Sequence, residues 1–431
     1  MSLVKNSAFS ALSLAIRVVT AAAALIIQAR FLGPETFGKF AFAIAIGAML
    51  SLITDFGMSL RSLRELSSGR YDPRSYVLTD LHLRLLLMIP FTLIALTVAV
   101  VGRKFTDQMA FLAVFAGFAA VSAGDYGLSL LRSLGRYSVE AKLAVITFSL
   151  QFLITIGFVM AWPTLLGSAT GLFVSRVVYL ALVALVVART LPQPKDGASP
   201  APIGHPVETL KKSIPYAQDV LISNGMAQVD VLIAGAALKP VDLGLYAIAN
   251  RGFQVVSQGL GAASTVFIPA MSSAQTDTPR LRRIANTLFM FSAGASSLAL
   301  ILITCFGGLL QHMVLGSRYD GLAPYWFWIG LSVFSRVLAS TTAMAIAAQG
   351  LQHVRVRAQF IGLACLGISS VLAFLFRLNG LFAALILTYG VITILQLLAL
   401  QRSATPPPRW FHPSLVAVII LAGVAQIALH H

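Results

Sequence analysis

Four arginines lie inside long apolar runs of the sequence. Arg17 lies in LSLAIRVVTAAAAL, Arg176 in GLFVSRVVYLALV, Arg251 in YAIANRGFQVV and Arg336 in GLSVFSRVLAST. A guanidinium stays charged and offers a planar fork of donors that fits phosphate oxygens. Residues of this type at these places predict the binding of an anionic head group that carries phosphate.

Four aspartates accompany the arginines. Asp55 and Asp125 lie near the ends of apolar runs, and Asp219 and Asp230 lie in the run at 213–237. Each carboxylate could bind a coupling ion, H+ or Na+, or it could pair with a nearby arginine at a helix end. We favour pairing for Asp55, Asp125 and Asp230, and the sequence leaves both interpretations open.

The apolar bulk of the chain requires a bilayer. Of the 431 residues, 58% are apolar and 11% are charged, whereas a soluble domain has about 45–50% apolar and about 25% charged residues. Spans of about 20 apolar residues match the thickness of the hydrocarbon layer. We therefore predict an all-α integral membrane protein, because an open sheet edge does not lie in lipid.

Thirteen apolar runs are candidate spans. They lie near residues 9–31, 38–60, 81–101, 108–131, 140–161, 165–188, 213–237, 241–270, 284–310, 324–348, 356–376, 380–400 and 413–430. The first run follows Lys5 without a cleavage site, so we expect it to be retained as a span.

The distribution of Lys and Arg predicts the orientation of these spans. With the N-terminus in the cytoplasm, 20 of the 31 Lys and Arg fall on the cytoplasmic side, seven on the opposite side and four within spans. Cytoplasmic loops of membrane proteins carry such an excess of positive charge. Topology thus explains the net charge of +16, and we expect no nucleic-acid partner.

The four arginines are costly inside a membrane. Each would oppose insertion by about 2.5–3.5 kcal/mol if it faced lipid at the centre of a span, and a hydrated cavity removes most of this cost. Such residues typically mark a substrate path, and a negative cytoplasm favours outward movement of an anion. The alternative for each arginine is a structural role, in which it snorkels or bonds to helix carbonyls.

A linker divides the sequence into two lobes. Residues 192–212, PQPKDGASPAPIGHPVETLKK, are rich in Pro, Gly, Ala and Ser and suit a flexible tether. We predict an N-lobe of six spans at 1–191, a cytoplasmic linker at 192–212, a C-lobe of six spans at 213–402 and an extra C-terminal span at 403–431.

Two short motifs recur in the two lobes. A constant offset of 206 residues pairs Pro34 with Pro240, Gly38 with Gly244, Phe40 with Tyr246 and Ala41 with Ala247. A second echo pairs Gly135, Val139 and Lys142 with Gly350, Val354 and Arg357. Because each lobe has an even number of spans, the repeat is predicted to be parallel, with the substrate between the halves.

We expect no cofactor and no metal. Cys305 and Cys365 both lie inside apolar runs, and the histidines are scattered without ligand spacing. No nucleotide-binding loop, nucleophile elbow or catalytic acidic motif occurs. These observations favour a transporter over an enzyme.

Residues 29–66 resemble a known family. This stretch has LGPETFG at 32–38, DFG at 55–57 and RE at 64–65. It is similar to the first two spans of Wzx-type polysaccharide-unit flippases of the multidrug/oligosaccharidyl-lipid/polysaccharide superfamily. The second half is similar to the same family at DVLIAG, 230–235, and GLYA, 244–247.

The resemblance implies two six-helix lobes that form a V-shaped, alternating-access transporter. The implied cargo is an undecaprenyl-diphosphate-linked oligosaccharide, moved from the cytoplasmic to the periplasmic leaflet of a bacterial inner membrane to build O-antigen, lipopolysaccharide or exopolysaccharide. A polysaccharide polymerase and chain-length machinery are the implied partners. Lipid II flippases of the superfamily line their cavity with arginines on the first and eighth spans, where Arg17 and Arg251 lie here.

Two other functions remain open. A drug or cation antiporter of the same superfamily would need acidic cavity residues for its cationic cargo, and the arginines disfavour it. A membrane enzyme of polysaccharide assembly would need a sizeable catalytic loop. The longest outer loop, about 311–323, is short and lacks paired carboxylates.

Overall fold

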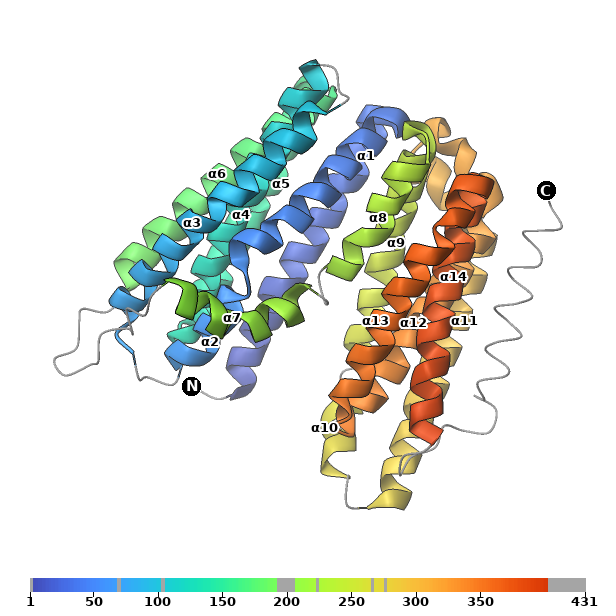
Figure 1. The fold of residues 1–431 in the computed structure, drawn as a ribbon. Coiled ribbons are helices and arrows are strands. Elements are labelled where there is room, and N and C mark those ends of the chain that lie inside the picture. The colour runs from blue at the N-terminus through green and yellow to red at the C-terminus, as the bar shows by residue number, and fades with distance from the viewer. Residues whose placement is uncertain are drawn as a thin grey trace. The chain divides into compact units, whose positions relative to one another are not determined.

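The computed structural model describes residues 3–67, 71–101, 105–191, 206–221, 225–264, 267–274 and 277–401. The regular elements in these ranges are all helices, as predicted (Figure 1). Eight helical segments of the described chain are long and apolar enough to cross a membrane. The protein is therefore an all-α, multi-pass membrane protein. The predicted span at 413–430 lies outside the described residues.

The chain divides into two compact units, Met1–Leu232 and Ile233–His431, which we call unit 1 and unit 2. The helix that follows the linker, α7 (Pro206–Val220), packs against α1 (Leu3–Asp55) and α2 (Met58–Ser67) of unit 1. The units thus divide later in the sequence than the linker at 192–212, and the lobe boundary there stays a prediction.

Helix α1 contains the first predicted span and most of the second, which ends at Asp55 rather than at residue 60. Gly33 interrupts it with φ 73° and ψ 168°, and Pro34 follows directly. Glycine adopts a positive φ without strain, and proline is well suited to the first turn of a helix. The Leu-Gly-Pro turn therefore ends one span and begins the next. Phe37 and Phe40, just after this turn, are 1% and 0% exposed.

The remaining long helices of unit 1 lie side by side (Figure 1). They are α3 (Pro73–Val100), α4 (Phe105–Ser133), α5 (Tyr137–Ala161) and α6 (Leu165–Thr190). Helix α3 begins earlier than the predicted span at 81–101, because the Asp72 carboxylate caps it by accepting from the backbone N–H of Ser75 at 2.9 Å.

Helices α4 and α6 approach each other closely. A Cβ on Gly124 would lie 2.3 Å from the Tyr179 ring, and a Cβ on Gly117 would lie 2.9 Å from Leu172. Small residues let the backbones of membrane helices come together. This packing brings Asp125, the neighbour of Gly124, next to Tyr179 of α6.

Unit 2 begins in α8 (Met226–Ala237) and is also helical. Its elements are α9 (Pro240–Ser264), α10 (Phe267–Ser273), α11 (Thr278–Val314), the 3-10 helix η2 (Ser317–Tyr325), α12 (Trp326–Ala348), α13 (Gln352–Ser369) and α14 (Val371–Gln401). Arg377 interrupts α14 with φ 51°, between the predicted spans at 356–376 and 380–400.

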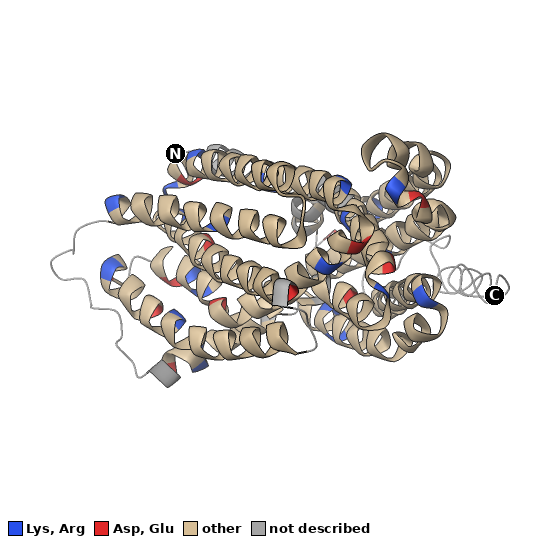
Figure 2. Ribbon diagram, turned by 90° about the horizontal axis from the view of Figure 1, so that it is seen from above, with Lys and Arg blue, Asp and Glu red and all other residues tan. Residues whose placement is uncertain are grey.

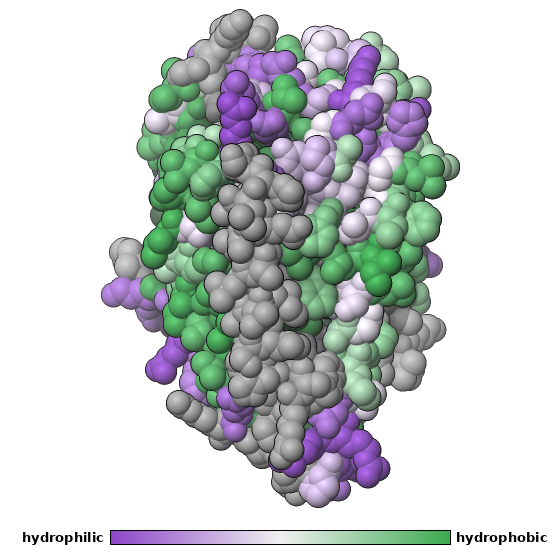
Figure 3. Space-filling view, turned by 90° about the vertical axis from the view of Figure 1, so that its right-hand side faces the viewer, coloured by the Kyte–Doolittle hydropathy of each residue, from purple (hydrophilic) through white to green (hydrophobic). Residues whose placement is uncertain are grey.

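The surface has the polarity of a membrane protein. On the face that Figure 3 shows, hydrophobic side chains lie at mid-height toward its left and right edges, and hydrophilic ones gather toward the two ends. Charged residues are sparse along the helices (Figure 2). The exposed leucines and isoleucines of α3 and α11 are lipid-facing in such a protein.

The predicted repeat has the same local structure in both units. Gly135 and Gly350 have φ values of 71° and 77°. Each donates its backbone N–H to the carbonyl three residues earlier, at 2.9 Å and 3.1 Å, and the next residue donates to the carbonyl five residues earlier, at 2.8 Å and 3.1 Å. This pattern ends a helix in the same way after α4 and after α12. The paired residues Phe40 and Tyr246 are both 0% exposed.

Candidate functional site

Arg17 and Asp125 form an ion pair between two helices of unit 1. Arg17 of α1 donates from Nη2 to Oδ2 of Asp125 on α4 at 2.5 Å. The Tyr179 hydroxyl of α6 donates to the other oxygen, Oδ1, at 2.7 Å. The Arg17 guanidinium also lies over the ring of Phe148 on α5, 5.3 Å from its centroid. Four helices therefore hold this pair in place.

Arg176 lies on α6 beside the same pair. Its guanidinium carbon is 3.8 Å from the centroid of the Phe118 ring on α4. It interacts electrostatically with both Asp125 and Arg17. Its Nη1 is buried and has no hydrogen-bond partner among the described residues. The structure thus brings two predicted arginines together around one carboxylate.

The other two predicted arginines lie in unit 2. Arg251 of α9 donates from Nη1 to Oε1 of Gln254 at 3.0 Å. The Arg336 guanidinium of α12 lies 5.7 Å from the ring centroid of Tyr389 on α14. Both side chains are thus ordered by neighbours within unit 2.

The remaining aspartates lie in different surroundings. Asp55, at the end of α1, accepts from Arg84 Nη2 at 2.6 Å and also from the Ser59 hydroxyl. Asp230 of α8 is 4% exposed, and its Oδ1 accepts from the Val231 backbone N–H at 2.8 Å. Asp219 lies on α7, and its side chain is outside the described part of the structure. Asp55 and Asp125 are therefore both paired with arginines, which leaves the role of each in ion coupling a prediction.

Glu140 is a buried acid that the sequence analysis missed. It has no exposed surface, and its Oε1 accepts from the Ser13 hydroxyl at 2.7 Å and from Arg132 Nη2 at 2.6 Å. It lies in the first turn of α5, where a negative charge is favourable. The sequence does not predict the burial of Glu140, because this burial depends on which residues meet across helices.

Asp80 and Arg61 form a second pair that was missed. Their side chains are 0% and 4% exposed and meet at 2.5 Å. Asp80 also accepts from the Ser62 hydroxyl at 2.7 Å and from the Tyr126 hydroxyl at 3.0 Å. The sequence places Asp80 and Arg84 four residues apart in TDLHLRLLL, but the predicted span begins only at residue 81 and leaves Asp80 outside it.

Arg61 also connects α7 to this end of unit 1. Its Nη1 donates to the Thr209 carbonyl at 3.1 Å and to the Ser213 hydroxyl at 2.8 Å. Burial lowers the pKa of Arg61, but the charge of Asp80 and the contacts with Tyr76 raise it by more, so its pKa lies above the ordinary value. The guanidinium is therefore a permanent cation that holds three helices together.

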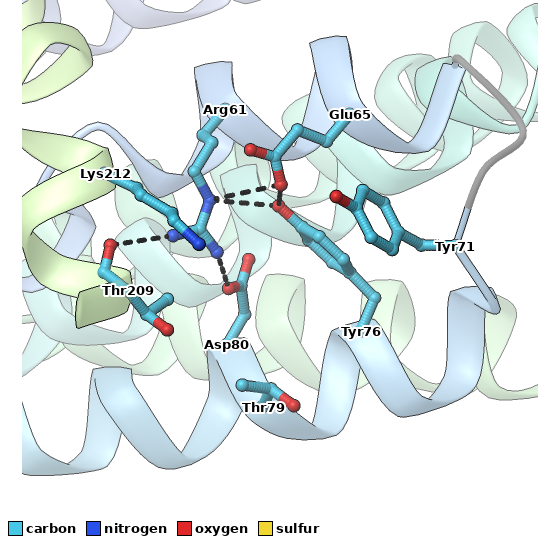
Figure 4. A pocket seen from close by; sticks show the side chains of 8 residues that line it. All are labelled: Arg61, Glu65, Tyr71, Tyr76, Thr79, Asp80, Thr209 and Lys212. Atoms are coloured by element: carbon cyan, nitrogen blue, oxygen red, sulfur yellow. Dashed lines mark hydrogen bonds and ion pairs between the residues drawn. The ribbon is translucent and has the colours of Figure 1, made fainter. Parts of the chain in front are cut away.

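A small polar cavity of about 40 Å³ opens beside Arg61 (Figure 4). Its lining combines α2, α3 and α7 with the residue Tyr71, and consists of Arg61, Glu65, Tyr71, Tyr76, Thr79, Asp80, Thr209 and Lys212. The volume fits a few water molecules. Arg61 pairs with Asp80 and Glu65 inside the cavity, and Lys212 pairs with Glu208 of its own helix, so this cavity is part of the α7 contact rather than a cargo site.

Comparison with solved structures identifies the fold. The chain is similar to an inward-facing multidrug resistance MATE family transporter of the MOP superfamily, at 13% identity and a TM-score of 0.65, with 96% of this chain and 98% of that chain covered. It is similar to the lipid II flippase MurJ in an inward closed conformation, at 14% identity and a TM-score of 0.64, with 97% of each chain covered. The eukaryotic MATE transporter AtDTX14 gives 14% identity, a TM-score of 0.57 and coverage of 98% and 99%.

These likenesses, at such low identity, establish a shared transporter fold. No curated protein matches the sequence. Residues 3–275, however, match the family described as polysaccharide biosynthesis protein. Because this match spans more than half of the 431 residues, the chain belongs to the polysaccharide biosynthesis protein family.

Proposed function

We propose that this protein is a flippase for polyprenyl-diphosphate-linked oligosaccharide units, of the Wzx type. It moves the cargo from the cytoplasmic to the periplasmic leaflet of a bacterial inner membrane by alternating access. Membership of the polysaccharide biosynthesis protein family supports a glycan pathway. The fold shared with a lipid II flippase supports a lipid-linked cargo.

One observation carries this proposal: the cluster of Arg17, Arg176 and Asp125 has two cations and one anion. Removing a charge from water without a partner is strongly unfavourable. The buried Nη1 of Arg176 lacks a hydrogen-bond acceptor in the described structure, so an anionic ligand would complete the site. A diphosphate offers the oxygens that a guanidinium binds best.

The roles of the arginines follow from this charge. Arg176 and Arg17 bind the diphosphate from unit 1, and Arg251 and Arg336 bind it from unit 2 at another stage of the cycle. The sugars occupy a hydrated cavity, and the polyprenyl tail stays in the bilayer. The membrane potential, with the cytoplasm negative, contributes about 2.3 kcal/mol per charge per 100 mV to outward movement of the anion.

A drug antiporter is the competing function, because MATE transporters share the fold. Such a protein with a cationic cargo needs a negatively charged site. The cluster in unit 1 has the opposite sign, and the family match also favours the glycan cargo. The two functions differ in the sign of the charge that must be moved.

Alanine variants test the proposal in a strain that lacks the chromosomal gene. Arg176→Ala and Arg251→Ala are expected to reduce surface polysaccharide by about tenfold or more, because a hydrogen bond to a charged group contributes about 1.5–3 kcal/mol. Both variants should reach the membrane in normal amounts, as measured by immunoblotting of membrane fractions.

Arg189→Ala is the matched control, since Arg189 is an exposed cation at the end of the same helix as Arg176. It should support normal export. Full export by both Arg176→Ala and Arg251→Ala would contradict the assignment of these arginines to the cargo.

A further inference from the structure

Asp125 is positioned as the counter-ion of Arg17. Both of its carboxylate oxygens are engaged, Oδ2 by Arg17 at 2.5 Å and Oδ1 by Tyr179 at 2.7 Å. The two donors come from different helices, α1 and α6. The carboxylate therefore has one partner that neutralises its charge and another that anchors it.

The Arg17–Asp125 pair is accessible, unlike the Arg61–Asp80 pair of the same unit. The side chains of Arg17 and Asp125 are 42% and 32% exposed, whereas those of Arg61 and Asp80 are 4% and 0% exposed. A ligand can reach an open pair and exchange with one of its members. It cannot reach an enclosed pair without unfolding the surrounding helices.

Arg176 favours the replacement of Asp125 by an anionic ligand at Arg17. It lies three residues before Tyr179 on α6, which is about one helical turn, and it interacts electrostatically with both Asp125 and Arg17. An anion that binds Arg176 must therefore come close to Asp125. Two like charges so near repel each other, so the arriving anion and the carboxylate compete for the same two guanidinium groups.

The other charged groups near the pair, Glu140 and Arg132, pair with each other. Glu140 of α5 also acts on Arg17, but it accepts hydrogen bonds from Ser13 and Arg132. Arg132 of α4 is thereby held by Glu140. Asp125 is therefore the carboxylate that an incoming anion meets at Arg17.

We propose that Asp125 is a resident counter-ion that the diphosphate of the cargo displaces from Arg17. This inference rests on the proposed function. Tyr179 keeps the carboxylate in place after Arg17 has turned to the diphosphate, so the ion pair can form again when the cargo leaves. Asp125 is thus a specificity-determining residue: the more negative charge and the more oxygens a ligand carries, the better it takes the place of the carboxylate.

This exchange predicts a preference among anions. A diphosphate competes successfully with Asp125, whereas a monophosphate, with fewer charges and fewer oxygens, competes poorly. Without the carboxylate, Arg17 is free for either ligand. Removing the charge of Asp125 should then strengthen the binding of both phosphates and weaken the discrimination between them. Removing a side chain that binds the cargo would instead weaken binding.

The test measures binding of farnesyl diphosphate and farnesyl monophosphate to the purified full-length protein in detergent, by calorimetry. The wild type should prefer the diphosphate. Asp125→Asn keeps an oxygen for the Tyr179 hydroxyl. It should bind the monophosphate about tenfold more tightly than the wild type does, because the carboxylate charge no longer competes for Arg17. The preference for the diphosphate should shrink.

Three further variants make the result specific. Asp107→Asn, on the same helix, removes a carboxylate that pairs with Lys39 at 3.5 Å and should leave both affinities unchanged. The double variant Arg17→Ala with Asp125→Asn should lose the gain, because the freed guanidinium is absent. Asp125→Ser is expected to show the same gain as Asp125→Asn and serves if the asparagine variant does not fold.

Equal or weaker binding of both ligands by Asp125→Asn would overturn the proposal, and so would an absence of binding in every variant. The proposed function is tested separately by glycan export. If the binding order is as expected but the strain that lacks the gene exports glycan normally, the counter-ion exchange stands and the glycan cargo is wrong.

Discussion

Enclosed ion pairs hold together the end of unit 1 where α2, α3 and α4 meet. Asp80 has no exposed surface and accepts hydrogen bonds from Arg61, Ser62 and Tyr126. Both carboxylate oxygens accept hydrogen bonds, so burial of the charged Asp80 side chain depends on these partners. Removing one member of a buried pair leaves an unbalanced charge, which costs about 3–5 kcal/mol.

Arg61→Ala is therefore expected to destabilise the protein strongly. It leaves the buried Asp80 carboxylate without its cation and removes both contacts to α7. The temperature of unfolding in detergent, followed by tryptophan fluorescence, should fall by several degrees. Lys39→Ala is the control, because the Lys39–Asp107 pair is partly exposed and such pairs contribute about 0–1 kcal/mol. Equal losses in the two variants would contradict the role of burial.

Single residues were only partly predictable from the sequence. An arginine in an apolar run, such as Arg176, is visible as a violation of the pattern, and the structure brings it to Arg17 and Asp125. Glu140 and Asp80 could not be recognised in the same way. Their roles depend on helices that meet in three dimensions, and the late start predicted for α3 hid Asp80 in a loop.

The position of helix α7 depends on a single glycine of unit 1. Gly57 has φ 71°, and a Cβ there would lie 2.4 Å from the backbone nitrogen of Ala217 on α7. No side chain fits this approach, and a non-glycine residue would also be strained at this φ. The close contact of α7 with the turn between α1 and α2 therefore requires glycine.

Gly57→Ala should loosen α7 from unit 1. Trypsin should then cleave after Lys211 or Lys212 much faster than in the wild type, as measured by mass spectrometry of limited digests. Gly157→Ala, in α5, is the matched control, because nothing lies within 4 Å of its Cβ. Slow cleavage in both variants would show that α7 does not depend on this approach.

The two repeated helix ends should respond alike to substitution. Gly135→Ala and Gly350→Ala each force a residue with a Cβ into a left-handed conformation, at a cost of about 1–2 kcal/mol, although nothing lies within 4 Å of either position. Similar decreases in unfolding temperature are expected for the two variants. A large effect at one position and none at the other would contradict their equivalence.

The sequence predicted the existence of the helices better than the residues at which they begin and end. The motif LGPETFG gave the turn between the first two spans, because Gly33 and Pro34 have fixed conformational preferences. Helix α7 was assigned to the second half because it follows the linker. Its packing on α2 depends on Arg61 and Gly57, which are distant in sequence.

The orientation of the whole molecule is a prediction from charge. Arg30 and Lys211, both exposed, lie on opposite sides of the membrane in the predicted topology. In a variant with Cys305 and Cys365 replaced by serine, Arg30→Cys should react with an impermeant maleimide in intact spheroplasts. Lys211→Cys should react only after lysis. The reverse pattern would contradict a cytoplasmic N-terminus.

At the scale of the molecule, composition alone required a membrane protein, and the internal repeat indicated two related halves. These two inferences are reliable because each depends on many residues. The cargo is a weaker inference, since it depends on the charge balance of a few side chains such as Arg17, Arg176 and Asp125. Transporters with this fold include MATE family proteins, so the fold does not select the cargo.

Transport in proteoliposomes tests the central claim most directly. The purified protein is reconstituted with a fluorescent polyprenyl-diphosphate-linked disaccharide, and the fraction of lipid accessible to an external lectin is followed over time. The wild type is expected to move this lipid across the bilayer, and Arg176→Ala is expected not to. A wild-type protein that leaves the lipid in its original leaflet while it transports a cationic drug would contradict the account.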